Sequence, residues 1–512
     1  MSDLAANQRS ILADLAHQAM LDRGFLADFG VEVLAELNAI TGPASAAPDA
    51  LRDLRDRPWC SIDNDDSRDL DQLTLAEWDA DGGTRILVAI ADVDALVPAG
   101  SAIDTHARHN TTAVYTPGRI FYMLPERLCT DLSSLDEGED RLALVIDMQL
   151  GPDGAVTESS LYRAWVRNQA RLAYNAVAAW LDDLGPAPPG MARVPGLDAQ
   201  LRRQDAAAER LRRHRHAAGA LGLESIEPRS VFLGEQLVDL RIEVKNRARE
   251  LIEDFMIAAN EATARFLDAN RRASLRRVVR EPKRWDRIVE LARELGDTLP
   301  STPDARALSA FLDARRAADP LRFPDLSLTV IKLLGAGEYI AIRPDDDTSG
   351  HFGLAVRHYT HSTAPNRRYT DLLTQRLVKA TLASAPAPYD FETLSRLARH
   401  CTEQEDEADR VERRMRKSAA ALMLAPHRGE RFDAVVTGAS PKGTWVRLLQ
   451  PPAEGLLLDA GPVDVGDRVA VRLVSTDVAR GFIDFALLAE SREAGRAPAQ
   501  GARTSKGSST GR

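Results

Sequence analysis

Two short apolar runs constrain the fold of this chain more than any other feature. Residues 85–93 (RILVAIADV) and 142–150 (LALVIDMQL) are rich in β-branched residues and are bounded by Gly, Asp or Pro, which is typical of buried strands. Helical patterns follow them, so the core is predicted to mix α and β structure. The chain has 512 residues, more than one compact domain usually holds, and we therefore expect a multidomain α+β protein.

Composition excludes several classes of protein. Hydrophobic residues make up 44% and charged residues 28% of the chain, which excludes a mostly disordered protein. The sequence lacks an 18-residue apolar window and a signal-peptide layout, so we predict a cytoplasmic protein without a membrane partner. Only three cysteines occur, which argues against a disulfide framework or a zinc site. The net charge of −10 argues against a general nucleic-acid coat but leaves local basic channels open.

The N-terminal region is predicted to be a small helical module. Apolar residues recur at helical spacing over residues 4–40, and a proline-containing stretch of small residues at 41–50 is typical of a linker. We assign residues 1–57 to this module and its linker. Two interpretations remain open, a helix-turn-helix domain and a helical cap on the next domain.

The central region, residues 58–427, is predicted to be a mixed α/β domain. After the two apolar runs, periodic patterns predict helices over residues 197–220, 247–270, 284–295, 304–317, 366–384 and 390–424. Residues 428–488 instead show five short strand patterns with turn signals, which predict a small barrel of the OB type. The tail, residues 489–512, is rich in Gly, Ser and Ala and is predicted to be disordered.

An acidic cluster gives the strongest chemical signal. The segment SIDNDDSRDLDQL (61–73) contains Asp63, Asp65, Asp66, Asp69 and Asp71. Such carboxylates repel one another unless they are solvated or hold a cation, and oxygen ligands without His or Cys favour Mg²⁺ or Mn²⁺. The alternatives are a solvated acidic loop and a calcium site, although the spacing does not match an EF-hand. The apolar run that follows places the acids beside a buried strand.

The acidic segment and the apolar run after it resemble the catalytic opening of the ribonuclease II (RNB) family of 3′→5′ exoribonucleases. The likeness continues, in order, through residues 105–135, 170–177, 251–267, 350–355 and 359–377. The C-terminal barrel resembles an S1 RNA-binding domain. Relative to the family, the short helical module at the N-terminus is atypical.

The resemblance implies roles for individual residues. Asp63, Asp69 and Asp71 stand where family members hold Mg²⁺, for which Mn²⁺ could substitute. Arg367, in the segment APNRRY, matches an arginine that binds the phosphate near the bond being cut. These four residues are the expected catalytic set, because arginine is a bidentate ligand of phosphate.

Further positions are expected to contact RNA. Tyr115 matches an aromatic residue that packs on the terminal base, while Tyr174 and Glu253 fall where relatives contact the sugar and favour ribose. Arg368 is a further expected RNA contact. Trp445, on the second strand of the barrel, is expected to stack on a base, and packing in the barrel core is the alternative.

The sequence also departs from the family pattern. Gln72 occupies the position of a usual fourth aspartate, so one ion would be held by an uncharged amide. Ser362, Ala364 and Asn366 replace common Phe, Ser and Ile residues beside Arg367. In addition, residues 1–57 leave no room for the usual pair of cold-shock barrels.

We therefore predict a monomeric enzyme that hydrolyses single-stranded RNA processively from its 3′ end, releasing nucleoside 5′-monophosphates by metal-activated water. Because the pair of cold-shock barrels is missing, we expect a more open entrance to the active site, which could also admit structured RNA. Two rival interpretations are an RNA-binding regulator that has lost catalysis and a nuclease that prefers DNA. Two basic stretches, 209–216 and 271–284, are either solvated helix faces or the lining of an RNA channel.

Overall fold

The structure is a computed structural model that describes residues 7–47, 51–78, 83–224, 228–243, 245–320, 322–346, 350–440, 443–461, 463 and 465–488. The predicted disordered tail at 489–512 lies outside these residues. The chain forms two compact units. The larger unit comprises Ala13–Glu227 and Glu243–Arg413, and the smaller unit comprises Met1–Leu12, Pro228–Ile242 and Arg414–Arg512.

A seven-stranded sheet forms the centre of the larger unit, with strand order β1-β8-β7-β4-β3-β2-β9. Its members are β1 (Arg52–Asp53), β2 (Cys60–Asp63), β3 (Gln72–Trp78), β4 (Thr84–Ala91), β7 (Asp140–Leu150), β8 (Val156–Arg167) and β9 (Ala170–Ala173). The two apolar runs form the neighbouring strands β4 and β7, which are antiparallel and almost fully buried. The prediction of buried strands is confirmed.

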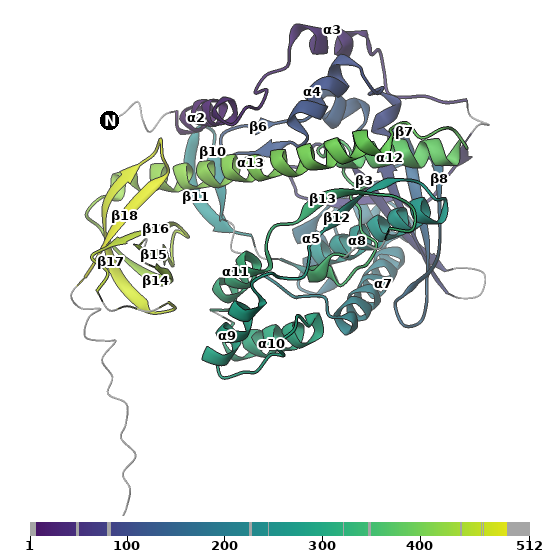
Figure 1. The fold of residues 1–512 in the computed structure, drawn as a ribbon. Helices are drawn as coiled ribbons and strands as arrows, with labels where there is room; N and C mark the ends of the chain where they lie inside the picture. Colours follow the sequence, from purple (N-terminus) through teal and green to yellow (C-terminus); the bar gives the residue numbers. More distant parts are fainter. Residues whose placement is uncertain are drawn as a thin grey trace, which may run out of the picture. The chain divides into compact units, whose positions relative to one another are not determined.

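The helices, in chain order, are α2 (Gln8–Asp22), α3 (Val31–Ala39), α4 (Ala102–Asn110), α5 (Tyr174–Leu181), α6 (Pro189–Ala192), α7 (Leu197–Ala218), α8 (Arg247–Ala269), α9 (Trp285–Glu294), α10 (Ala305–Ala318), α11 (Phe323–Leu334), α12 (Tyr369–Leu382) and α13 (Phe391–Leu424). Four short helical segments accompany them among the described residues: η2 (Val93–Ala95), the π-helical η3 (Leu128–Leu132), η4 (Phe352–Leu354) and η5 (Ala425–His427). Helices α7 and α8 pack against each other and against the sheet (Figure 1). The six predicted helices are confirmed to within three residues at each end.

Two smaller elements complete the larger unit. Helices α9, α10 and α11 enclose a separate hydrophobic core that includes Trp285, Phe311 and Phe323. Two antiparallel strand pairs, β12 (Ser274–Val278) with β13 (Glu338–Ile342) and β5 (Val114–Tyr115) with β6 (Ile120–Phe121), lie outside the central sheet.

Helix α3 packs on the core of the larger unit. Val33 belongs to the main hydrophobic cluster, and the carboxylate of Glu36 accepts hydrogen bonds from the backbone N–H groups of Ala102 and Ile103 at the start of α4. These contacts fit the helical-cap interpretation of this part of the N-terminal module.

The smaller unit contains the predicted barrel. Strands β14 (Arg431–Ser440), β15 (Gly443–Leu448), β16 (Glu454–Leu458), β17 (Arg468–Asp477) and β18 (Phe482–Leu487) close in the order β14-β15-β16-β18-β17, which fits the OB fold. Gly455 is required in β16, because a Cβ there would lie 2.5 Å from the Phe485 ring. The unit also holds the hairpin β10 (Pro228–Leu233) and β11 (Gln236–Ile242).

Within the described ranges, no helix combines the length and the apolar character needed to cross a membrane.

Candidate active site

The acidic segment connects two strands of the central sheet. Asp63 is the last residue of β2, and its Oδ1 accepts hydrogen bonds from the Asn64 backbone N–H (2.7 Å) and the Ser67 hydroxyl (2.8 Å). These bonds fold residues 64–67 into a turn, as Asp side chains commonly do. The apolar Leu70 is buried, and its N–H donates to Ser134 Oγ. The sequence therefore forms a loop whose two ends are fixed.

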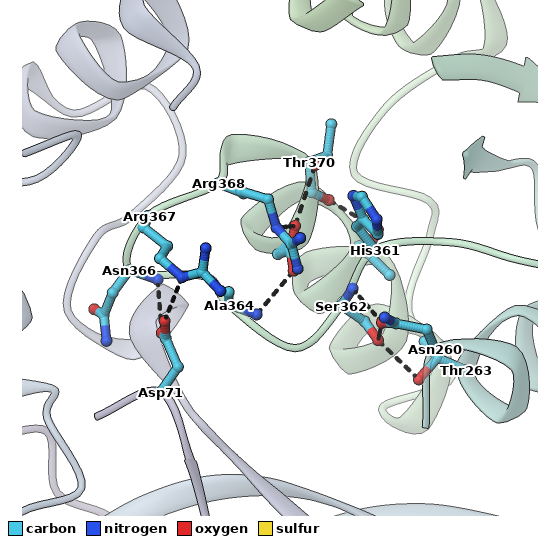
Figure 2. A network of polar contacts seen from close by, with 12 residues as sticks. Asp71, Asn260, Thr263, His361, Ser362, Ala364, Asn366, Arg367, Arg368 and Thr370 are labelled. Carbon is cyan, nitrogen blue, oxygen red and sulfur yellow. Dashed lines mark hydrogen bonds and ion pairs between the residues drawn. The ribbon is translucent and has the colours of Figure 1, made fainter. Parts of the chain in front are cut away.

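Asp71 lies at the inner end of this loop and is only 2% exposed. Its Oδ1 accepts the backbone N–H of Asn366 at 3.1 Å, and its Oδ2 lies 3.6 Å from Nε of Arg367 (Figure 2). Burial raises the pKa of Asp71 to about 7, the Arg367 guanidinium opposes the rise, and the charge of Asp69 adds to it. The structure thus brings together two of the predicted catalytic residues.

Asp69 and Tyr115 flank this pair. The Tyr115 hydroxyl lies 3.4 Å from Asp69 Oδ2, and the tyrosine side chain is partly exposed. Burial raises the pKa of Asp69, the Arg367 guanidinium opposes this rise, and the charge of Asp63 adds to it. Tyr115 therefore lies beside the acids, and its packing on the terminal base stays a prediction.

The loop that carries Arg367 is held from two sides. Asn260 Oδ1, on α8, accepts hydrogen bonds from both the N–H and the hydroxyl of Ser362, while Asp371 Oδ1, on α12, accepts the N–H of Ala364 at 2.8 Å. Ser362 also bonds Thr263 on α8 (Figure 2). The departures at 362 and 364 thus fit a loop fixed by hydrogen bonds, and Arg367 itself stays 43% exposed and accessible to a substrate.

Arg368 has a different environment from Arg367. Its Nε and Nη2 both donate to the fully buried carboxylate of Asp371, at 3.0 and 2.8 Å. A guanidinium held in this bidentate way has few donors left for a ligand. The geometry favours a structural role for Arg368, and its predicted RNA contact stays a prediction.

Tyr174 lies beside the acids at the start of α5. Burial raises the pKa of its hydroxyl above the usual range, the charge of Asp63 adds to the rise, and Arg249 and Arg367 oppose it. Glu253, one of the two predicted sugar contacts, forms an ion pair with Lys245 and is about half exposed. The structure places Tyr174 at the site but records no contact of Glu253 with the aspartates among the described residues.

Gln72 is the first residue of β3 and pairs with Ile90 of β4. Because successive side chains of an extended chain point to opposite faces, Gln72 does not share the face of Asp71. Its role as a metal ligand stays a prediction.

Trp445 belongs to the smaller unit. Buried Val446 and Leu448 face the barrel core from β15, whereas Trp445 and Arg447 alternate with them and are partly exposed. This alternation places Trp445 on the outer face of the barrel and favours base stacking over core packing, and the RNA contact of Trp445 stays a prediction.

Most basic side chains of the two basic stretches form ion pairs with acidic residues of this protein. In residues 209–216, Arg212 and Arg215 both pair with the buried Asp254 on α8. In residues 271–284, four arginines pair with acids, in the pairs Arg271–Asp345, Arg276–Asp268, Arg277–Glu405 and Arg280–Glu338. These stretches join secondary-structure elements, and the geometry does not favour an RNA channel lined by them.

The carboxylates of Asp63, Asp69 and Asp71 are the candidate ligands of a divalent cation. Among the described residues, no group of three or more His, Cys, Asp or Glu side chains lies close enough together to hold a metal ion. The predicted convergence of three aspartates is therefore not seen. The acids interact as two overlapping pairs, Asp63 with Asp69 and Asp69 with Asp71. Magnesium usually takes one or two carboxylates together with substrate phosphates and water, so these oxygen donors fit it.

Sequence reasoning missed two residues that shape the site. Asp371 anchors the loop of Arg367, and Arg249 donates to Asn64 in the acidic loop. Helical spacing could have suggested Arg249, because it lies one turn before Glu253 on α8. A buried partner such as Asp371 leaves no comparable signal in the sequence.

Comparison with known proteins agrees with this fold. Residues 51–384 match the RNB domain, and residues 430–488 match the RNase II-type exonuclease C-terminal S1 domain. Ribonuclease R of Thermotoga maritima is 31% identical over 91% of this chain and 69% of its own length. Ribonuclease R of Escherichia coli K12 is 30% identical over 86% of this chain, which spans 58% of that relative. The chain thus spans 58–69% of the length of these two relatives.

Solved structures share the fold. Mycoplasma genitalium RNase R in complex with ribose methylated single-stranded RNA superposes with a TM-score of 0.83 at 23% identity, covering 94% of this chain and 78% of that one. Yeast Ssd1, a pseudonuclease, gives a TM-score of 0.68 at 16% identity, covering 86% of this chain and 55% of that one. The predicted family resemblance is confirmed by the domain matches and the relatives, and this chain belongs to the RNB-domain family of ribonucleases, with an RNase II-type S1 domain at its C-terminal end.

Proposed function

We propose that this protein is a hydrolytic 3′→5′ exoribonuclease that degrades single-stranded RNA processively to nucleoside 5′-monophosphates. One observation carries the proposal: Arg367 Nε lies 3.6 Å from the buried Asp71, although the two residues come from distant parts of the chain. A cation-binding carboxylate beside an exposed guanidinium is equipment for phosphodiester hydrolysis. Family membership and ribonuclease R relatives support the same activity.

The residues of the site divide the work by their chemistry. Arg367, fixed at its base and exposed at its tip, binds the scissile phosphate and stabilises the charge that develops on it. The partly exposed ring of Tyr115 stacks on the terminal base without reading its identity. Tyr174 borders the site near Asp63, where the sugar of the terminal nucleotide would lie.

A divalent cation, Mg²⁺ with Mn²⁺ as a substitute, is part of the proposal. Asp63, Asp69 and Asp71 would hold it, and when bound it would activate water and stabilise the leaving oxygen. The raised pKa of Asp69 and of Asp71, caused first by burial, supports a cation there, because a nearby positive charge would favour their ionised forms.

The test is digestion of 5′-end-labelled single-stranded RNA. With Mg²⁺ the wild type should release mononucleotides from the 3′ end, and EDTA should stop the reaction. Asp71→Asn, which keeps the shape but removes the charge, should reduce cleavage by about 10²–10³-fold and retain RNA binding. Asp65→Asn is the matched control, because Asp65 is exposed in the same loop. Full hydrolysis by Asp71→Asn would overturn the assigned site.

A catalytically weakened RNA-binding regulator is the second candidate. Gln72 in place of an acid and the absence of three convergent acids among the described residues favour it, and the fold also occurs in a pseudonuclease. It predicts gel shifts with RNA and no mononucleotide release at any Mg²⁺ or Mn²⁺ concentration. Matched RNA and DNA oligomers in the same assay test the third alternative, a nuclease that prefers DNA.

Structured RNA is a further proposed substrate. A solved Mycoplasma genitalium RNase R is in complex with double-stranded RNA, and it shares the fold of this chain with a TM-score of 0.82 at 24% identity. A hairpin with a 3′ tail tests the idea here. Digestion into the stem would support it, whereas a fixed stall several nucleotides before the stem would contradict it.

A further inference from the structure

Arg249 joins three segments of the larger unit beside the acidic loop. It lies in the first turn of α8, and its Nη2 donates to Asn64 Oδ1 at 2.6 Å and to Glu243 Oε2 at 3.0 Å. Its guanidinium carbon lies 4.7 Å from the centroid of the Tyr174 ring, at the start of α5. Helix α8, helix α5 and the acidic loop therefore meet at one guanidinium.

The contact with Asn64 acts directly on a carboxylate of the site. Asn64 follows Asp63, and its backbone N–H donates to Asp63 Oδ1 at 2.7 Å. The side chain of Asn64 is thus held by Arg249 while its backbone holds Asp63. A charge-assisted bond of 2.6 Å is among the stronger hydrogen bonds of proteins, so the orientation of Asp63 depends on Arg249 through one residue.

The position of α8 makes this anchor firm. The side chain of Asn246 caps the helix by accepting the backbone N–H of Arg249 at 3.0 Å, and the Asn246 amide also donates to Asn175 on α5. The backbone of Arg249 is therefore fixed where α8 begins. Its side chain is 26% exposed and stays within reach of solvent on one side, so its removal should not open the hydrophobic core.

We propose that Arg249 is a positioning residue that holds the Asp63 carboxylate in the geometry needed for a divalent cation. The proposal rests on the proposed function, which includes the divalent cation at Asp63, Asp69 and Asp71. Arg249 touches neither Asp69 nor Asp71 in any recorded contact among the described residues, so it acts through Asn64. Groups that orient metal ligands in this indirect way typically change metal affinity or activity by about 10–100-fold.

The experiment compares Arg249→Met with the wild type. Arg249→Met keeps the aliphatic stem over Tyr174 and removes the hydrogen bonds. We expect the affinity for Mn²⁺, measured by electron paramagnetic resonance without RNA, to fall by about tenfold, together with kcat at fixed Mg²⁺, while KM for RNA changes by less than about threefold. Arg249→Lys should recover part of the Mn²⁺ affinity.

Two further variants separate positioning from a general effect. Arg265 lies at the other end of α8 and forms an exposed ion pair with Glu261. Arg265→Met removes only this pair, so the variant should bind Mn²⁺ as the wild type does. Asn64→Ala should reproduce the defect of Arg249→Met, and the double variant should be no weaker than either single one, because both changes break the same link.

The outcomes distinguish this inference from the proposed function. Unchanged Mn²⁺ affinity in Arg249→Met, or additive effects of the two single changes, would overturn the positioning role. A wild type that binds Mn²⁺ but releases no nucleotides would overturn the proposed function alone, since the Mn²⁺ measurement does not require catalysis.

Discussion

Oδ2 of Asp71 lies 3.6 Å from Nε of Arg367, and the backbone N–H of the neighbouring Asn366 donates to the other oxygen of the same carboxylate (Figure 2). The buried carboxylate of Asp71 therefore accepts a main-chain hydrogen bond from this loop and forms an ion pair with a guanidinium of the same loop. The Arg367 side chain is nevertheless 43% exposed. Four predictions test this arrangement and the structure around it.

The first prediction concerns Arg367. Arg367→Met removes the guanidinium and should lower kcat on single-stranded RNA by about 10²–10³-fold, because the charge that develops on the phosphate loses its stabilising donors. Arg367→Lys should recover only part of the loss, since an ammonium cannot bind phosphate in a bidentate manner. Single-turnover digestion measures the rates of both variants. Full activity of Arg367→Met would exclude Arg367 from catalysis.

The second prediction concerns Asp371. Asp371→Asn leaves the mostly buried guanidinium of Arg368 without its carboxylate partner, and should lower the free energy of unfolding by about 3–5 kcal/mol. Thermal unfolding measures the change as a fall in melting temperature. Asp345→Asn is the matched control, because its pair with Arg271 is about 70% exposed and should contribute less than about 1 kcal/mol. Equal shifts in the two variants would contradict the importance of the buried pair.

The third prediction concerns Tyr115. Tyr115→Ala should weaken the binding of a short RNA by about 1–3 kcal/mol, the usual value of one base stacked on an aromatic ring, whereas Tyr115→Phe should keep most of the affinity. Fluorescence anisotropy in EDTA measures binding without cleavage. If Tyr115→Phe and Tyr115→Ala weaken RNA binding equally, the hydroxyl beside Asp69 contributes to the affinity rather than the ring.

The fourth prediction concerns stability in acid. Burial lowers the pKa of His106 to about 4, and burial also lowers the pKa of His351 to about 4. Between pH 6.5 and pH 4 the unfolded chain takes up protons that the folded chain does not, so stability falls as the pH falls, by up to about 1.4 kcal/mol per pH unit for each histidine.

His106→Phe checks this slope, because the Phe ring can keep the packing of His106 against Phe29. The melting temperature of this variant should depend less steeply on pH between 6.5 and 4 than that of the wild type. His427→Gln, at an exposed position, should leave the slope unchanged. A slope for His106→Phe equal to that of the wild type would mean that His106 is not the group responsible.

Some of the secondary structure escaped prediction for a physical reason. Strand β8, twelve residues long, contains many exposed polar positions, because one part of an antiparallel strand can face water without an apolar pattern. Helix α11 was also not predicted, although it lies in the small core with α9 and α10. The buried strands β4 and β7 were predicted because both of their faces require apolar residues.

The sequence alone determined most of the kinds of elements, the family, and which acids, arginine and aromatic residues are candidates for the chemistry, because periodicity and ordered motifs are local properties of the chain. Only the tertiary structure decided that Asp71 is buried against Arg367, that Arg368 is occupied by Asp371, and that Arg249 reaches Asn64. Each of these contacts joins side chains whose distance and direction depend on how helices and strands pack. Burial and hydrogen-bond geometry therefore turned a set of candidate residues into a site with distinct roles.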